Sequence, residues 1–251
     1  MVAETGGQNA MIVDSTALPE QVIKDVVHSA FQSAGQRCSA LRVLFIQEDI
    51  SERVIELLKG AMAELNIGNP GYRSTDVGPV IDAEARTGLQ QHIEKMKAAG
   101  RLIAETPLPA DLDGYFVAPV AFRLDSISEL EKEQFGPVLH VVTWRNKDLD
   151  KIIDDINATG FGLTMGIHSR NEDTAEHIDS RVRIGNVYVN RNQIGAVVGV
   201  QPFGGQGLSG TGPKAGGPHY LLRFVTERTR TINTTAVGGN ASLLSLGDGE
   251  P

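Results

Sequence analysis

Short runs of apolar residues alternate along this chain with longer segments whose apolar residues recur every three or four positions. A short apolar run fits a buried strand, whereas the longer period is typical of an amphipathic helix. We expect strands at residues 10–13, 41–46, 101–104, 115–122, 138–144, 163–168 and 186–190, and helices at 19–35, 51–65, 83–99, 149–158 and 171–181. This alternation predicts the α/β class, with helices covering both faces of a mainly parallel sheet in three layers.

Composition excludes several classes of protein. With 41% apolar and 22% charged residues, the 251-residue chain is too ordinary for a disordered, collagen-like or disulfide-rich protein. The 23 Lys and Arg residues against 31 Asp and Glu residues give a net charge of −8, which disfavours nucleic acid and anionic membranes as partners. No apolar run approaches the ~20 residues of a membrane span, and the first residues lack a signal-peptide pattern. We expect a cytoplasmic protein.

The amino-acid composition of the chain changes after residue 190. Residues 195–217 are dense in glycine, which favours a binding loop over a helix or strand. Within them, residues 205–210 satisfy the G-x-G-x-x-G pattern, but no strand precedes it and no helix follows it, so we reject a dinucleotide-binding fingerprint. Residues 228–235 alternate in a way that suits an edge strand. The six histidines show no close ligand spacing, so we expect no metal site.

Cys38 is the single cysteine, so the chain has no internal disulfide. It lies between the end of a predicted helix and the next element. Backbone N–H groups and the positive end of a helix there would lower the thiol pKa and favour a nucleophilic thiolate. The alternative is a small buried apolar residue, which composition alone favours.

Glu4 is a second candidate, because two glycines follow it closely at positions 6 and 7. A carboxylate on such a tight turn is suited to act as a general base. The alternative is an ordinary exposed glutamate near a chain end.

Four segments together resemble the aldehyde dehydrogenase superfamily. Four motifs occur in the family's order along the chain. A glutamate followed by a tripeptide ending in Gly-Gly lies at residues 4–7, and Gly-Gln-x-Cys lies at 35–38. Glu-x-Phe-Gly-Pro-Val follows at 133–138 and Pro-Phe-Gly-Gly-x-x-x-Ser-Gly at 202–210. The resemblance implies an NAD-dependent enzyme in which Cys38 is the nucleophile and Glu4 the general base. It also implies that Glu133 holds the nicotinamide ribose and that Phe135 packs beside the ring.

Residues 211–218 are similar to the aldehyde-anchor loop of 1-pyrroline-5-carboxylate dehydrogenases, which oxidise glutamate γ-semialdehyde to glutamate. The resemblance implies that backbone N–H groups of Gly216 and Gly217, with Ser39, grip the substrate α-carboxylate, and that Phe224 forms an aromatic wall. Glycine suits such an anion nest, because it permits unusual φ angles and close approach. Two alternatives stay open: another acidic aldehyde as substrate, or glycines that merely turn the chain.

Residues 233–244 are similar to the C-terminal end of bifunctional proline-utilisation proteins. We therefore expect a catalytic domain at 1–227, followed at 228–251 by a segment for oligomerisation or domain contact. The family's dinucleotide-binding domain and its oxyanion asparagine precede this segment. We expect an upstream region or another chain to supply that domain, with a proline dehydrogenase module as a further candidate partner. A homo-oligomer is expected, and a catalytically silent assembly module is the alternative from another class.

Overall fold

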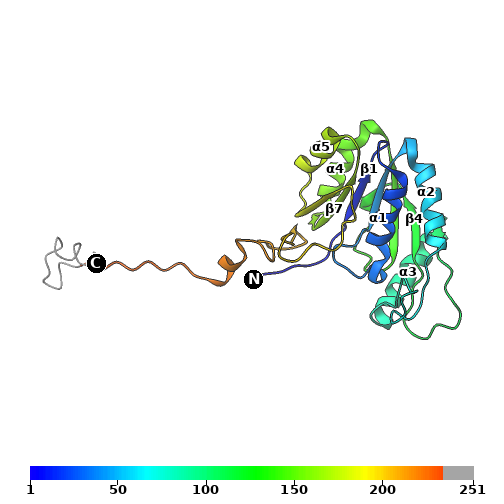
Figure 1. The fold of residues 1–251 in the computed structure, drawn as a ribbon, viewed down its shortest axis with the longest axis horizontal. Coiled ribbons are helices and arrows are strands. Elements are labelled where there is room, and N and C mark those ends of the chain that lie inside the picture. The colour runs from blue at the N-terminus through cyan, green and yellow to red at the C-terminus, as the bar shows by residue number, and fades with distance from the viewer. Residues whose placement is uncertain (234–251) are drawn as a thin grey trace. The chain divides into compact units, whose positions relative to one another are not determined.

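The computed structural model describes residues 1–233 (Figure 1). The chain divides into two compact units, Met1–Tyr220 and Leu221–Pro251. This division lies near the predicted boundary between residues 227 and 228. Within residues 1–233 no helix is long and apolar enough to cross a membrane.

A seven-stranded sheet forms the centre of the first unit, with the strand order β3-β4-β5-β2-β1-β7-β8. All neighbouring pairs are parallel except β3 with β4. The strands are β1 (Ala10–Val13), β2 (Val43–Gln47), β3 (Leu102–Glu105), β4 (Val120–Leu124), β5 (Val138–Trp144), β7 (Thr164–His168) and β8 (Asn186–Val189). A separate two-stranded sheet pairs β6 (Phe161–Gly162) with β9 (Gln206–Gly207). The predicted α/β class with a mainly parallel sheet is confirmed.

Five α-helices connect these strands: α1 (Pro19–Phe31), α2 (Glu48–Ala63), α3 (Ala83–Ala98), α4 (Leu149–Ala158) and α5 (Glu172–Arg181). Short 3-10 turns are η1 (Gln32–Gly35), η2 (Ile127–Glu129), η3 (Asn146–Asp148) and η4 (Tyr220–Phe224). The strands up to β5 lie on one side of β1, while β7 and β8 lie on the other. Because crossovers between parallel strands are right-handed as a rule, this order predicts α1 and α2 on one face and α4 and α5 on the other. Figure 1 shows this arrangement.

The central strands are buried on both faces, which explains their continuous apolar sequences. Every residue of β1 and β2 is buried, and β1 pairs in parallel with β2 on one side and β7 on the other. Burial of each Val, Ile or Leu side chain contributes ~1.5–3 kcal/mol. The sheet is thus a rigid base for the loops at its two edges.

Three predicted boundaries differ from the structure. The helix predicted to continue to residue 35 ends at Phe31, because Ser33 and Ala34 have left-handed φ angles of 56° and 53°. The strand predicted from residue 115 begins at Val120, directly after Pro119, whose nitrogen cannot donate to a ladder. Helix α2 begins at Glu48, three residues before the predicted start. The other predicted elements agree to within about two residues.

The glycine-dense segment 195–217 contains no helix and only the two-residue strand β9. It is tied down by a bridge between Phe203 and Ala215 and by another between Glu4 and Gly210. Residues 228–233 form no strand in the described structure, and the rest of the expected edge strand and tail lies outside the described residues.

Candidate active site

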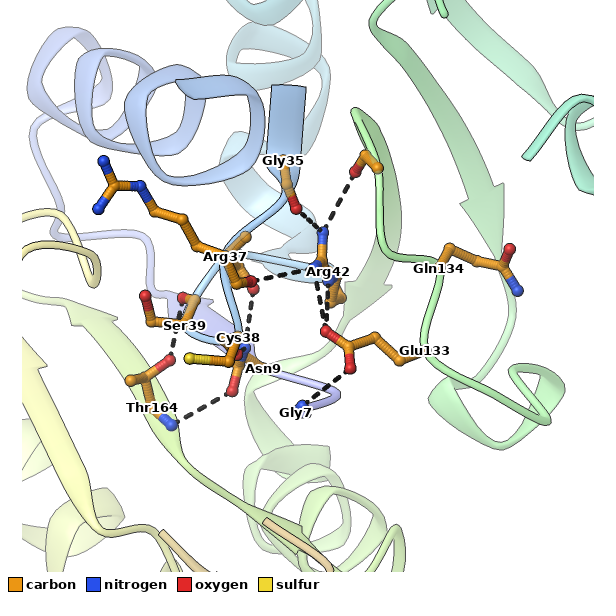
Figure 2. Close-up of polar contacts among 12 residues, drawn as sticks. Gly7, Asn9, Gly35, Arg37, Cys38, Ser39, Arg42, Glu133, Gln134 and Thr164 are labelled. Carbon is orange, nitrogen blue, oxygen red and sulfur yellow. Dashed lines mark hydrogen bonds and ion pairs between the residues drawn. The ribbon is translucent and has the colours of Figure 1, made fainter. Parts of the chain in front are cut away.

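The motif residues gather at the amino-terminal edge of the sheet. Glu4 precedes β1, Cys38 precedes β2 and Glu133 precedes β5. Because β5, β2 and β1 are parallel neighbours, the segments before them meet at one edge. Three segments far apart in the sequence are thereby brought around one thiol (Figure 2).

A sharp turn at residues 33–38, here called the nucleophile turn after its proposed role, leads from α1 to Cys38. Gly35 has a left-handed φ of 65°, and a Cβ atom there would lie 2.2 Å from the carbonyl oxygen of Gly136. Only glycine fits this contact, because any side chain would collide with backbone rather than with a movable group. The turn before Cys38 is therefore packed directly against the segment that carries Glu133.

The Cys38 thiol is half-buried, and its pKa is raised above the ordinary value. Burial is the largest cause, and the negative charges of Glu133 and Glu4 add to it. Backbone N–H groups of Cys38 and Ser39 lower the pKa by a smaller effect. The expectation of a lowered thiol pKa is thus wrong for this structure. The helix before Cys38 ends there, so it presents its negative end, and the element that follows is strand β2.

Glu4 is exposed and held by the glycine-dense segment. It forms an antiparallel bridge with Gly210, and the N–H of Thr5 donates to the carbonyl of Ser209 at 3.1 Å. A Cβ atom on Gly204 would lie 3.4 Å from Glu4 Oε1. The first and fourth motifs are therefore side by side, and the Glu4 carboxylate is close enough to Cys38 to affect its pKa.

Glu133 bonds to both neighbouring motifs. Its Oε1 accepts from Arg42 Nη2 at 2.9 Å and from Nε at 3.2 Å, and its Oε2 accepts from the Gly7 N–H at 3.1 Å (Figure 2). A Cβ atom on Gly6 would lie 1.9 Å from Oε2. The paired glycines after Glu4 thus make room for the Glu133 carboxylate.

Arg42 is a site residue that the sequence patterns did not reveal. It is fully buried, and Nη1 donates to the carbonyls of Gly35 at 2.8 Å and Gly136 at 3.2 Å, while Nη2 donates to that of Arg37 at 3.1 Å. Its Cζ lies 5.2 Å from the centre of the Phe135 ring. The available signal was a lone charge inside the apolar run at residues 40–46.

Asn9 is the second residue missed. Its Nδ2 donates to the carbonyls of Cys38 at 2.6 Å and Ala40 at 2.9 Å, and its Oδ1 accepts from the N–H of Thr164 at 3.2 Å. These bonds tie the nucleophile turn to the first residues of β1 and β7. The only sequence signal was an amide side chain directly before a buried strand.

The residues expected to hold the substrate come from two loops of the first unit and from the second unit. Ser39 is buried, and its carbonyl accepts from Thr164 Oγ1 at 3.1 Å. Gly216 is exposed with a left-handed φ of 72°, while the Gly217 N–H donates to the Lys214 carbonyl at 3.0 Å. An anion would therefore have to compete with that bond. Phe224 belongs to the second unit.

A shallow cavity of about 170 Å³ adjoins the Glu133 segment, lined by residues that include Gln36, Leu89, Glu133 and Phe135. The Phe135 side chain is exposed, which suits stacking against a flat ring. A carboxylate accepts about four hydrogen bonds, and Glu133 uses three, so one position remains for a ribose hydroxyl. The residues present thus fit the nicotinamide end of NAD. Among residues 1–233, no group of His, Cys, Asp and Glu side chains is arranged to hold a metal ion.

Comparison with known proteins agrees with this geometry. The profile of the aldehyde dehydrogenase family matches residues 1–230. The bifunctional protein PutA of Klebsiella aerogenes is 55% identical over 91% of this chain, which covers 18% of PutA. The 1-pyrroline-5-carboxylate dehydrogenase of Geobacillus kaustophilus is 38% identical over 91% of this chain, which covers 44% of that enzyme.

Solved structures show the same likeness. A crystal structure of a bifunctional proline utilization A protein superposes with a TM-score of 0.89 and 61% identity, covering 94% of this chain and 24% of that one. A Thermus 1-pyrroline-5-carboxylate dehydrogenase with bound NAD superposes with a TM-score of 0.81 and 38% identity, covering 89% of this chain and 43% of that one. The chain therefore spans about a fifth of the PutA relatives and less than half of the shorter ones.

Proposed function

The chain belongs to the aldehyde dehydrogenase family, and we propose that it is the catalytic part of an NAD-dependent 1-pyrroline-5-carboxylate dehydrogenase. The proposed reaction is the oxidation of L-glutamate γ-semialdehyde to L-glutamate in proline catabolism. One observation carries the proposal: the parallel strands β1, β2 and β5 bring the segments of Glu4, Cys38 and Glu133, which belong to three separate motifs, to one edge of the sheet. Identities of 54–56% to PutA proteins support the substrate assignment.

In the first step the Cys38 thiolate attacks the aldehyde carbon and forms a thiohemiacetal on its sulfur. Negative charge develops on the former carbonyl oxygen. The backbone N–H of Cys38 is suited to stabilise that charge, and Asn9 holds the carbonyl of the same residue. Glu133 and Phe135 would hold the nicotinamide end of NAD, which would supply the acceptor for the hydride whose loss converts the thiohemiacetal to a thioester.

In the second step Glu4 acts as general base. Its carboxylate takes a proton from a water molecule, and the water oxygen attacks the thioester carbon. The bond from that carbon to the Cys38 sulfur breaks, which restores the thiolate and releases glutamate. The exposure of Glu4 suits this role, because the attacking water must come from solvent. Its bridge to Gly210 holds the backbone while the side chain stays free to turn.

Recognition of the substrate α-carboxylate is proposed to involve the N–H groups of Gly216 and Gly217, the hydroxyl of Ser39 and the ring of Phe224. The bridge between Phe203 and Ala215 supports this role for the glycines, because it ties their loop to the segment beside Glu4. We further propose that an upstream region or another chain supplies the NAD-binding domain, and that residues 228–251 contribute to assembly of an oligomer.

The test is NADH formation with glutamate γ-semialdehyde, measured for this chain alone and with the NAD-binding domain of a relative. We expect turnover in the second case and none in a Cys38→Ser control. No NADH in either arrangement, from protein shown to be folded by circular dichroism, would refute the proposal. Equal rates with an uncharged aldehyde of similar size would refute the proposed substrate and leave the reaction type standing.

A further inference from the structure

Arg42 is a buried cation at the contact between two motif segments. On one side it binds the carbonyls of Gly35 and Arg37 in the nucleophile turn. On the other side it binds the Glu133 carboxylate and the Gly136 carbonyl. Both segments are thus held by one side chain, whose exposed fraction is 1%.

The geometry requires arginine rather than a generic cation. A guanidinium presents five N–H donors in a rigid plane. Here Nε and Nη2 both donate to Glu133 Oε1, Nη2 also donates to the Arg37 carbonyl, and Nη1 donates to the carbonyls of Gly35 and Gly136. A lysine ammonium presents three donors from one point and does not reach all four partner groups. Lysine at position 42 would therefore keep the charge but lose the fixed spacing of the segments.

The charge of Arg42 also bears on the thiol. Burial lowers the pKa of Arg42, and the nearby Glu133 and Cys38 oppose that shift. Attraction between opposite charges acts on both groups, so the guanidinium should favour the Cys38 thiolate. The Glu133 carboxylate disfavours the thiolate. Opposite charges of one ion pair thus act on Cys38 in opposite directions.

We propose that Arg42 is a positioning residue that holds the nucleophile turn and the Glu133 segment together, so that a change of charge or bonding at Glu133 alters the reactivity of Cys38. The inference rests on the proposed function only where it treats Cys38 as the nucleophile and Glu133 as a cofactor contact. A ligand hydroxyl that binds Glu133 would be sensed at the thiol through this pair.

The experiment is the rate of Cys38 alkylation by iodoacetamide across pH 6–10, followed by intact mass on the whole chain. Cys38 is the only cysteine, so each added mass reports on this thiol. The variants are Arg42→Met, Arg42→Lys and Glu133→Gln. The matched control is Arg101→Met, which removes an arginine paired with Asp125 and Glu129 outside the site.

Arg42→Met leaves the Glu133 charge uncompensated and should raise the apparent thiol pKa, slowing alkylation at pH 7.5 about tenfold, the equivalent of one pKa unit. Glu133→Gln should lower the apparent pKa and speed alkylation. Arg42→Lys should restore the pKa in part but leave the rate of the fully ionised thiol altered, because the turn is less fixed. Arg101→Met should change neither.

Shifts of the same sign in Arg42→Met and Glu133→Gln, or shifts no larger than that of Arg101→Met, would overturn the inference. If Arg42→Met does not fold, Arg42→Lys decides the matter, because it keeps the charge but not the fork of donors, and an alkylation rate of the fully ionised thiol equal to that of the parent chain refutes the positioning role. The assay needs neither NAD nor aldehyde. Turnover in a chain whose variants show no coupling would refute this inference alone. Coupling in a chain that shows no turnover would refute the proposed function alone.

Discussion

The two edges of the central sheet both bury polar groups, but they use them differently. At the carboxyl edge, Asp14 Oδ1 accepts from Thr16 N at 2.8 Å and from Thr16 Oγ1 at 2.6 Å, and its Oδ2 accepts from Ser169 Oγ. Asn190 closes this network, exchanging bonds of 3.0 and 2.8 Å with the backbone of Ser169. The bonds to Thr16 lie within one loop, and those of Ser169 to Asp14 and Asn190 join loops to one another.

At the amino edge the polar groups surround the Cys38 thiol. Arg42, Glu133 and Asn9 fix the backbone on either side of Cys38, while Glu4 stays exposed. Ligands of open α/β sheets ordinarily bind beyond the carboxyl ends of the strands, and in this chain the proposed site is at the opposite end. A buried polar network by itself therefore does not mark a site. The proposed site is distinguished by the Cys38 thiol, by two nearby carboxylates and by glycines without room for a side chain.

The sharpest contrast comes from removing one side chain at each edge. We expect Cys38→Ser to lower kcat of the reconstituted enzyme by about 10⁴-fold or more, because no other group can carry the acyl intermediate. Its free energy of unfolding should change by about 0.5 kcal/mol or less. Ser169→Ala at the carboxyl edge should show the reverse, with lost stability and an unchanged kcat in folded protein. Comparable losses of kcat in both variants would remove the distinction.

Replacing the proposed base should separate the two chemical steps. Glu4→Gln keeps the size and the backbone bridge but cannot take a proton, so steady-state turnover should fall by about 10²–10⁴-fold. Acylation does not need Glu4, so a burst of NADH and a thioester adduct on Cys38 should remain. Stopped-flow absorbance and intact mass measure these quantities. Loss of the burst together with turnover would assign Glu4 to the first step instead.

Two histidines allow the edges to be compared by pH. Burial lowers the pKa of His140 to about 3, and its Nε2 lies 2.9 Å from that of His92. The unfolded chain protonates this residue below about pH 6.5 and the folded chain does not until about pH 3, so the contribution of His140 to stability should fall as pH drops through this window, by at most roughly 1.4 kcal/mol per unit. His92, whose pKa is lowered to about 4, adds to the slope. Urea unfolding at pH 7, 5.5 and 4.5 measures the slope, which His140→Gln should flatten.

His168 is the control for that comparison. Burial also lowers its pKa, but the Asp25 carboxylate opposes the shift. His168→Gln should therefore flatten the same pH dependence less than His140→Gln does. An equal or larger effect at His168 would mean that burial alone governs both residues.

The smallest expected effect concerns the carboxyl-edge network. Asp14→Asn loses charge-assisted bonds from Thr16 and Ser169, so the free energy of unfolding should fall by about 2 kcal/mol. The alkylation rate of Cys38 should not change, because the thiol is at the other end of the strands. A changed alkylation rate at equal folded fraction would show that the edges are coupled through β1.

Much of the fold follows from local pattern. Strands 10–13 and 138–144 and helix 149–158 have the predicted bounds, because each is continuous and apolar or strongly amphipathic between clear breaks. The strand predicted from residue 115 starts late, since a proline interrupts the ladder. The helix predicted to continue to residue 35 ends early, because Ser33 and Ala34 take left-handed conformations that non-glycine residues do not favour.

The candidate site divides in the same way. Glu4, Cys38, Glu133 and Phe135 are recognisable because the motif order along the chain carries them. Arg42 is not, because its ion pair with Glu133 joins residues 91 positions apart.

The sequence by itself determined the α/β class, the family resemblance and which residue types are available for chemistry. The tertiary structure alone decided how those residues act on one another. Local pattern suggests a lowered pKa for the Cys38 thiol, and the fold raises it instead. The physical reason is that the effects of burial and of neighbouring charges on a pKa depend on distance in space. Parallel pairing of β1, β2 and β5 brings three distant segments to one edge, and no local segment of the chain encodes that distance.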